Sequence, residues 1–312
     1  MLLRSMTLKD LCPYLDRRGL RYELEEGALI IRWSGTVVRF YLRDVDGPQL
    51  ECEMFFGPSD VPSIDFLHRV NEWNASYVHP IARMIPNHAD LRNCLAMRDF
   101  YFLQAGATQE QLDAYLPYFL DTMRTILEFF EGFISACPGL SEAAWQDNLR
   151  APHGAWAGVI GHPIAQAVAE NTSTDPLRDV EGFANLMDFE DSDLGLSDAP
   201  AGMTLEHFIE RGPTFMTRAS LELPLDPIQA IMAANEWNKK TKSARVYYDL
   251  DLESLISEVV AFSGCGFNRA QMVNVVRRSA HHAIAGLNAT LRAVGYNASS
   301  ALNAYEEFLL PD

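Results

Sequence analysis

One tetrapeptide, Asn-Glu-Trp-Asn, occurs twice in the chain, at residues 71–74 and again at residues 235–238. The apolar positions before it also recur 164 residues later, Ile64 as Ile228 and Leu67 as Ile231. This three-residue spacing places the same apolar face on a helix in both copies. A repeat of this length predicts a tandem duplication, and it constrains the fold more than any other feature of the sequence.

A second feature repeats downstream of the tetrapeptide, where a glycine turn leads into a helix. In the first copy, Gly106 to Leu112, Thr108 is the expected N-cap and Gln111 follows three residues later. In the second copy Asn268 and Gln271 have the same spacing. Each pair can form a capping box, in which the two residues satisfy backbone N–H groups at the start of the helix.

The repeat divides the chain into three parts. Residues 1–134 form the first predicted domain, residues 135–202 an acidic, partly helical linker, and residues 203–312 a second, degenerate domain. Period-two alternation and glycine-containing turns predict strands in both domains. Apolar residues three and four positions apart predict helices.

Both predicted domains combine an antiparallel sheet with helices. In the first we expect a helix at 7–19, strands at 22–24, 29–33, 37–42 and 50–56, the motif helix from 63, strands at 80–85 and 91–103, and a long helix at 109–132. In the second we expect a helix at 204–211, a strand at 214–223, the motif helix from 227, strands at 244–249 and 255–262, and a long helix at 269–293. The fold class is therefore α+β, with two tandem domains of which the second has a reduced sheet.

Small residues line one face of the last predicted helix, where the first copy has large side chains. They are Ser279, Ala280, Ala283, Gly286 and Ala289. Small side chains allow another element to approach closely, so we expect this helix to pack against a second helix and not only against its own sheet.

The net charge of −17 is concentrated in the predicted linker. Residues 135–200 hold eleven acidic and two basic side chains, which is more than half of the excess. An acidic surface repels phosphate groups, so neither nucleic acid nor an anionic membrane is expected as a partner. The sequence also shows no apolar run of membrane-spanning length and no signal-peptide pattern, and we expect a cytoplasmic protein.

Five scattered cysteines, without a Cys-x-x-Cys pair, predict neither a disulfide framework nor a thiolate zinc site. The eight histidines do not cluster with carboxylates at ligand spacing, so no metal and no cofactor are expected. Phosphate-binding and dinucleotide-binding glycine patterns are absent from the sequence, as is a Gly-x-Ser-x-Gly nucleophile motif. The sequence therefore predicts no enzyme, although a triad of distant residues such as His162, Asp249 and Cys265 stays open as a hydrolase alternative.

The order of elements and two motifs resemble the YbjN family, described as bacterial sensory transduction regulators. These motifs are Asn-x-x-Asn at the end of the central helix (Asn71 and Asn74) and Gly-Ala-Thr-Gln-Glu-Gln-Leu at 106–112. The resemblance covers most of residues 5–132 and, more weakly, residues 203–293. It implies a fold like that of class I type III secretion chaperones, a tendency to dimerise and a non-enzymatic role in binding or regulation.

The repeated motif itself is expected to be structural. Asparagines at a helix end pair with backbone groups or tie the helix to the next strand, and tryptophans fill gaps in a core. This prediction covers six residues: Asn71, Trp73, Asn74, Asn235, Trp237 and Asn238.

The sequence is compatible with two functions. The first is a module that binds an unknown protein partner. The alternative is a small-molecule sensor with an apolar pocket between sheet and long helix, lined by Trp73, Phe100 and Phe102 or by Trp237, Tyr247 and Phe262. A duplicated chain can also supply both protomers of a dimer, so we expect the two halves to form an intramolecular pseudo-dimer, with a homo-oligomer also possible.

Overall fold

The computed structural model of the chain describes residues 7–25, 27–33, 36–44, 48–86, 93–103, 107, 109–134, 203–210, 214–240, 244–262 and 269–296. These fall into two compact units. The first comprises Met1–Phe66 and Ala82–Asn171, and the second comprises Leu67–Ile81 and Thr172–Asp312. The predicted linker and the predicted capping residues Thr108 and Asn268 lie outside the described residues.

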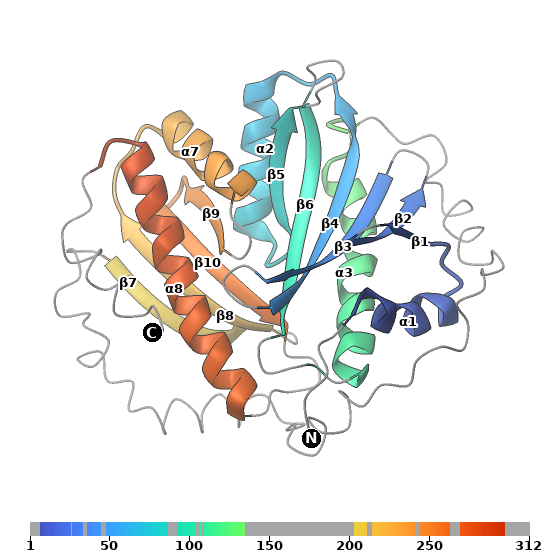
Figure 1. The fold of residues 1–312 in the computed structure, drawn as a ribbon. Helices are drawn as coiled ribbons and strands as arrows, with labels where there is room; N and C mark the ends of the chain where they lie inside the picture. Colours follow the sequence, from blue (N-terminus) through green and yellow to red (C-terminus); the bar gives the residue numbers. More distant parts are fainter. Residues whose placement is uncertain are drawn as a thin grey trace. The chain divides into compact units, whose positions relative to one another are not determined.

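Six strands form the sheet of the first unit, in the order β1-β2-β3-β4-β6-β5 (Figure 1). Their bounds are β1 (Glu23–Glu25), β2 (Ala28–Trp33), β3 (Thr36–Asp44), β4 (Pro48–Ser59), β5 (Ile81–Pro86) and β6 (Asn93–Phe102). Neighbouring strands from β1 to β6 pair antiparallel. Gly27 links β1 to β2 with a φ of 79°, a left-handed conformation that glycine adopts without steric cost.

The core of the first unit lies between this sheet and the long helix α3 (Gln109–Phe129). Phe40 on β3 meets Phe119 on α3 edge to face, with 6.1 Å between ring centres, and the Tyr115 hydroxyl lies 3.5 Å from the Cys52 sulfur. All four side chains are fully buried. Burying an aromatic ring of this size contributes about 1.5–3 kcal/mol to the stability of the fold.

Shorter helices complete the first unit. The 3-10 helix η1 (Leu8–Leu11) leads into α1 (Cys12–Arg17), and Gly19 with a φ of 71° follows the end of α1. α2 (Ser63–Ser76) carries the first Asn-Glu-Trp-Asn, and the division between the units falls inside it. The motif in α2 therefore belongs to the second unit by its contacts.

Four antiparallel strands form the sheet of the second unit, in the order β7-β8-β10-β9 (Figure 1). They are β7 (Met203–Glu210), β8 (Thr214–Glu222), β9 (Ala244–Asp249) and β10 (Ser254–Phe262). The α+β class and the smaller second sheet predicted from the sequence are confirmed, since the first sheet has six strands and the second has four.

The helix predicted at residues 204–211 is wrong, because this segment is strand β7. Leu205, Phe208 and Ile209 have helical spacing, yet a segment of eight residues is too short for periodicity to decide. The adjacent β8 offers a full ladder of backbone partners, from Met203 opposite Leu221 to Glu210 opposite Thr214. Pairing along that ladder satisfies the backbone and overrides the local pattern.

Two helices pack on the second sheet. α7 (Pro227–Lys240) starts as predicted at an aspartate N-cap, where Asp226 Oδ1 accepts a 2.9 Å hydrogen bond from the Gln229 N–H. α8 (Arg269–Ala293) lies on β8, β9 and β10 and also contacts α7 (Figure 1). The predicted helix contact is therefore present, and Gly286 on α8 lies close both to the sheet, at Ser257 and Val246, and to Trp237 of α7.

Gly286 lies close to β10 and α7, and replacing it with alanine is expected to destabilise the protein by about 1–3 kcal/mol. An added Cβ would lie 2.5 Å from Ser257 Oγ and 3.1 Å from Trp237 Nε1. Denaturant unfolding of Gly286→Ala measures this cost. Because Ser257→Ala removes the nearest atom, the double variant should recover part of the loss, and a Gly286→Ala protein of wild-type stability would contradict the close packing.

Candidate functional site

Both motif tryptophans anchor the end of their helix to the strand that follows. Trp73 Nε1 donates to the carbonyl of Pro80 at 2.8 Å, and Trp237 Nε1 donates to the carbonyl of Ala244 at 3.1 Å. In each case the acceptor lies seven residues further along the chain. Trp73 is 1% exposed and stacks on Tyr77 with 4.1 Å between ring centres, whereas Trp237 is only partly buried.

Two motif asparagines bind the outer edge of strand β9. Asn238 accepts from the Val246 N–H and donates to the Val246 carbonyl, both at 2.8 Å. Asn71 makes the same pair of bonds with Tyr248, at 3.0 Å and 2.8 Å. A primary amide has the donor and acceptor geometry of a peptide group, so each asparagine acts as one residue of a neighbouring strand. Two helices thereby cover an edge that would otherwise invite pairing with another chain.

Asn71 and Asn238 do not occupy the same position of the motif, because the repeat aligns Asn71 with Asn235 and Asn74 with Asn238. All four amides are nevertheless buried. They surround, together with Leu67, Val70, Ile231, Ala234 and Val246, a cavity of about 10 Å³. A cavity of this size holds about one water molecule. It is too small for a metabolite, and the structural role predicted for the motif remains a prediction.

Replacing either asparagine with alanine should speed hydrogen exchange at one specific backbone amide of β9. In Asn71→Ala the Tyr248 N–H is expected to exchange faster, and in Asn238→Ala the Val246 N–H, since each loses its acceptor. A buried amide without a partner costs about 1–3 kcal/mol. Hydrogen exchange resolved by residue measures both effects, and each variant is the control for the other. Equal exchange at both amides in both variants would contradict the assigned pairs.

A buried carboxylate between two arginines lies on the face of the second sheet that points away from α8. Glu258 on β10 pairs with Arg218 on β8 and with Arg245 on β9, and its side chain is fully buried. The Tyr247 hydroxyl adds a 3.1 Å hydrogen bond to the same carboxylate. Burial by itself raises the pKa of Glu258, but the two guanidinium groups outweigh it and hold the pKa below its ordinary value.

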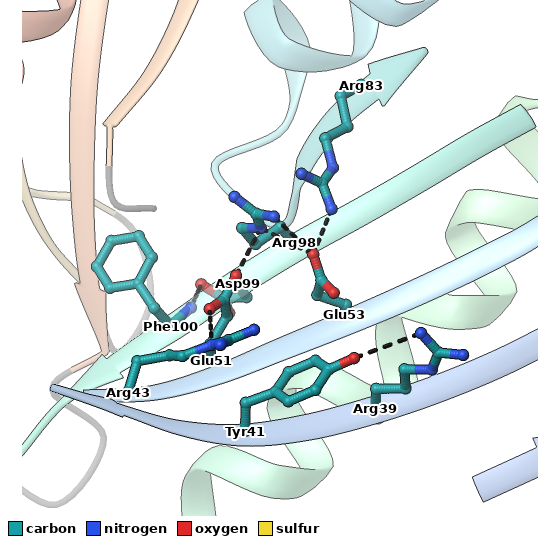
Figure 2. A network of polar contacts seen from close by, with 9 residues as sticks. All are labelled: Arg39, Tyr41, Arg43, Glu51, Glu53, Arg83, Arg98, Asp99 and Phe100. Atoms are coloured by element: carbon teal, nitrogen blue, oxygen red, sulfur yellow. Dashed lines mark hydrogen bonds and ion pairs between the residues drawn. The ribbon is translucent and has the colours of Figure 1, made fainter. Parts of the chain in front are cut away.

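The first sheet carries a similar buried cluster, shown in Figure 2. Arg83 and Arg98 both bind Glu53, the latter at 2.7 Å. Arg98 also binds Glu51 at 2.9 Å, and Arg43 reaches Glu51 at 3.3 Å. Burial, followed by the charge of Arg98, lowers the pKa of Arg83.

The two clusters have opposite charge at aligned positions. The glycine turns before α3 and α8 align Arg98 with Glu258, 160 residues later. Across the strands, Arg98 faces Glu53 in the first sheet, while Glu258 faces Arg218 in the second. A cross-strand pair of opposite charges is thus kept in both sheets with its polarity reversed.

His207 on β7 is a titratable group of the second unit with a shifted pKa. Its ring lies parallel to Phe215 with 5.9 Å between centres, and its Nδ1 is 2.9 Å from the Thr217 hydroxyl. Burial disfavours the charged imidazolium and lowers the pKa of His207 to about 4.

This shift predicts a pH dependence of stability. An unfolded histidine titrates near 6.5, so between about pH 6.5 and pH 4 the unfolded chain binds a proton that the folded chain does not. The contribution of His207 is full above pH 6.5 and is lost as the pH falls towards 4, by about 1–3 kcal/mol. Thermal unfolding of His207→Gln over this range should show a flatter profile than wild type, and identical profiles would exclude His207 as the cause.

Three of the residues expected to line a pocket under the long helices, Phe100, Phe102 and Tyr247, point to the other face of their sheet. Tyr101 packs against Tyr115 of α3, so the alternation of β6 turns Phe100 and Phe102 to the opposite face. In the second unit Tyr247 binds Glu258 on the face away from α8. The expectation that these aromatic residues face the long helix is therefore wrong, because a one-residue change of position along a strand reverses the side chain.

Of the three residues of the possible triad, the structure describes Asp249. Asp249 accepts the N–H groups of Asp251 and Leu252 at 3.0 Å each, which closes the turn after β9. His162 and Cys265 lie outside the described residues. Within the described part of the chain, no helix is long and apolar enough to cross a membrane, and no group of three or more potential metal ligands occurs.

The arginine–glutamate clusters were not predicted, although the sequence contains a signal for them. Arg39 and Arg43, like Glu51 and Glu53, occupy alternate positions in segments predicted as strands. Charged residues that alternate along neighbouring strands share one face of a sheet. Which of them pair, and that the carboxylates are buried, depends on the register between the strands.

Comparisons with known proteins point to a family for the first part of the chain. Residues 7–132 match the YbjN family model, described as "Putative bacterial sensory transduction regulator". Among solved structures the chain is similar to YbjN from E. coli, described as "a putative transcription regulator", with 15% sequence identity and a TM-score of 0.37 over 43% of this chain and 98% of that chain. Curated proteins give no match. The resemblance to the YbjN family is thus confirmed for residues 7–132, while the tandem copy and the chaperone-like fold stay predictions.

Proposed function

We propose that the chain is a non-enzymatic regulatory module of the bacterial cytoplasm that works, like a secretion chaperone, by binding another protein. The observation that carries this proposal is the match of residues 7–132 to a family described as a regulator of sensory transduction. The small cavity at the repeated motif adds support, because its volume of about 10 Å³ leaves a metabolite no room there.

We further propose that the two halves of the chain act together as a pseudo-dimer. Support comes from Leu67–Ile81, which belongs to the first copy of the repeat by sequence and to the second unit by its contacts. The two hydrogen bonds between the Asn71 side chain and the Tyr248 backbone are one such contact. The loss of protection at Tyr248 in Asn71→Ala, described above, is therefore also a test of this pairing.

Affinity capture from the native bacterial cytoplasm, followed by mass spectrometry, tests the proposed function. A candidate partner should then bind the purified chain in a saturable titration at micromolar concentration or below. A thermal-shift screen with metabolites runs in parallel. Stabilisation by a metabolite, with no protein that binds in purified form, would favour the sensor alternative and contradict the proposal.

A further inference from the structure

Three alternating residues of β3, Arg39, Tyr41 and Arg43, form a strip on the sheet face opposite α3 (Figure 2). Their neighbour Phe40 points to α3, where it contacts Phe119, so period two directs the strip to the other face. The Arg43 side chain is 48% exposed, and Arg39 and Tyr41 are partly exposed. We call these three residues the arginine strip.

The arginine strip has capacity for further anionic contacts. Arg39 makes no ion pair with a described residue: its guanidinium lies 5.3 Å from the centre of the Phe55 ring, and its Nη1 is 3.4 Å from the Tyr41 hydroxyl. Arg43 uses its Nε for Glu51 at 3.3 Å and lies 4.7 Å from the centre of the Tyr41 ring. A guanidinium held against an aromatic ring can present its outer N–H groups to a carboxylate, and here these are the Nη groups, because the Nε of Arg39 is buried and the Nε of Arg43 binds Glu51.

The local charge of this face has the opposite sign to the whole chain. The clustered residues are the arginines Arg39, Arg43, Arg83 and Arg98 and the carboxylates Glu51 and Glu53. Within this cluster the excess is two positive charges on a protein of net charge −17. On the neighbouring strands Arg32 pairs with both Glu23 and Glu25, so including these three residues leaves an excess of one positive charge on the face. The excess thus resides at the arginine strip.

The spacing within the strip selects the shape of the ligand. Residues four positions apart on a strand are about 13 Å apart, which is too far for one phosphate or one small dicarboxylate to bridge. Two carboxylates four residues apart in an extended peptide have the same spacing, and the residue midway between them would lie over Tyr41. Arg–carboxylate pairs of this kind can be bidentate, which gives them strength and orientation.

We propose that the arginine strip binds an extended acidic segment of a partner protein, with carboxylates four residues apart and an apolar residue between them. This inference rests on the proposed protein-binding function and names the surface and the partner chemistry. The overall negative charge opposes a long polyanion along its whole length. A short peptide meets mainly the local field, because charges further than about 8 Å are screened at physiological ionic strength.

Fluorescence anisotropy with a labelled peptide Gly-Glu-Thr-Val-Thr-Glu-Gly tests this proposal on the full chain. Saturable binding is expected, with a dissociation constant that rises at high salt. Arg39→Gln and Arg43→Gln should each weaken binding by about tenfold, as the loss of one charged hydrogen-bonded pair does. Arg124→Gln is the matched control: this α3 arginine has an 82% exposed side chain and belongs to a surface pair with Glu128, so binding should not change.

Three results would overturn the proposal. They are equal binding of a peptide with adjacent glutamates, unchanged binding by Arg39→Gln in a protein with wild-type melting behaviour, and stronger binding of a labelled oligothymidine than of the peptide. Repeating the capture experiment with the Arg39→Gln/Arg43→Gln chain separates the two proposals. A native partner retained by this variant leaves the protein-binding function standing and removes the strip as its site.

Discussion

Replacing Glu258 with alanine is expected to lower the free energy of unfolding by about 3–5 kcal/mol, because it leaves buried arginine charge without its counter-ion. The Arg245 side chain is 4% exposed, so water cannot take the place of the carboxylate there. The lowered pKa of Glu258 means that its stabilising contribution is present near neutral pH and is lost as the pH falls through that pKa. The difference between wild type and variant should therefore shrink in acid.

Urea unfolding at pH 7 and in acid measures this effect. Glu236→Gln is the matched control, since this carboxylate forms a surface pair with Lys239 on α7 and should cost less than 1 kcal/mol. A triple variant, Arg218→Met, Arg245→Met and Glu258→Leu, should recover most of the loss because it removes the charges together. A Glu258→Ala protein as stable as the control would contradict the buried cluster.

Trp73→Ala is expected to destabilise the protein by about 3–5 kcal/mol, as large-to-small changes in a packed core do. The side chain is 1% exposed, stacks on Tyr77 and anchors the end of α2 through Pro80. Trp237→Ala should cost less, about 2–3 kcal/mol, because the corresponding ring is only partly buried.

Thermal and urea unfolding of both variants test this order. Trp73→Phe keeps most of the ring area but loses the indole N–H, so it should cost about 1 kcal/mol from the hydrogen bond alone. Equal losses for the two alanine variants would contradict the unequal burial. Melting curves like wild type for Trp73→Ala would remove the core assignment and favour a surface role for the motif.

Most helices and strands could be predicted from the sequence because their patterns are local. The N-cap Asp226 and Pro227 predict the start of α7, and alternation predicts β9 and β10 within a residue of their bounds. The helix prediction for residues 204–211 was wrong because the apolar spacing of this segment fits a helix, while the partner strand that decides its conformation lies elsewhere in the sequence. Periodicity shows which residues share one face of a helix or strand, but it does not show which other element packs against that face.

For the candidate site, too, the sequence predicts which residues share a face but not which residues they contact. The sequence alone determines that Asn71 and Asn74 share a helix face and that Arg39, Tyr41 and Arg43 share a sheet face, since both follow from residues per turn and per strand. Only the tertiary structure decides that Asn71 binds the backbone of Tyr248 and that Glu258 is enclosed by Arg218 and Arg245. These contacts join residues distant in sequence, and they are fixed by strand register and by the burial of polar groups that must find partners.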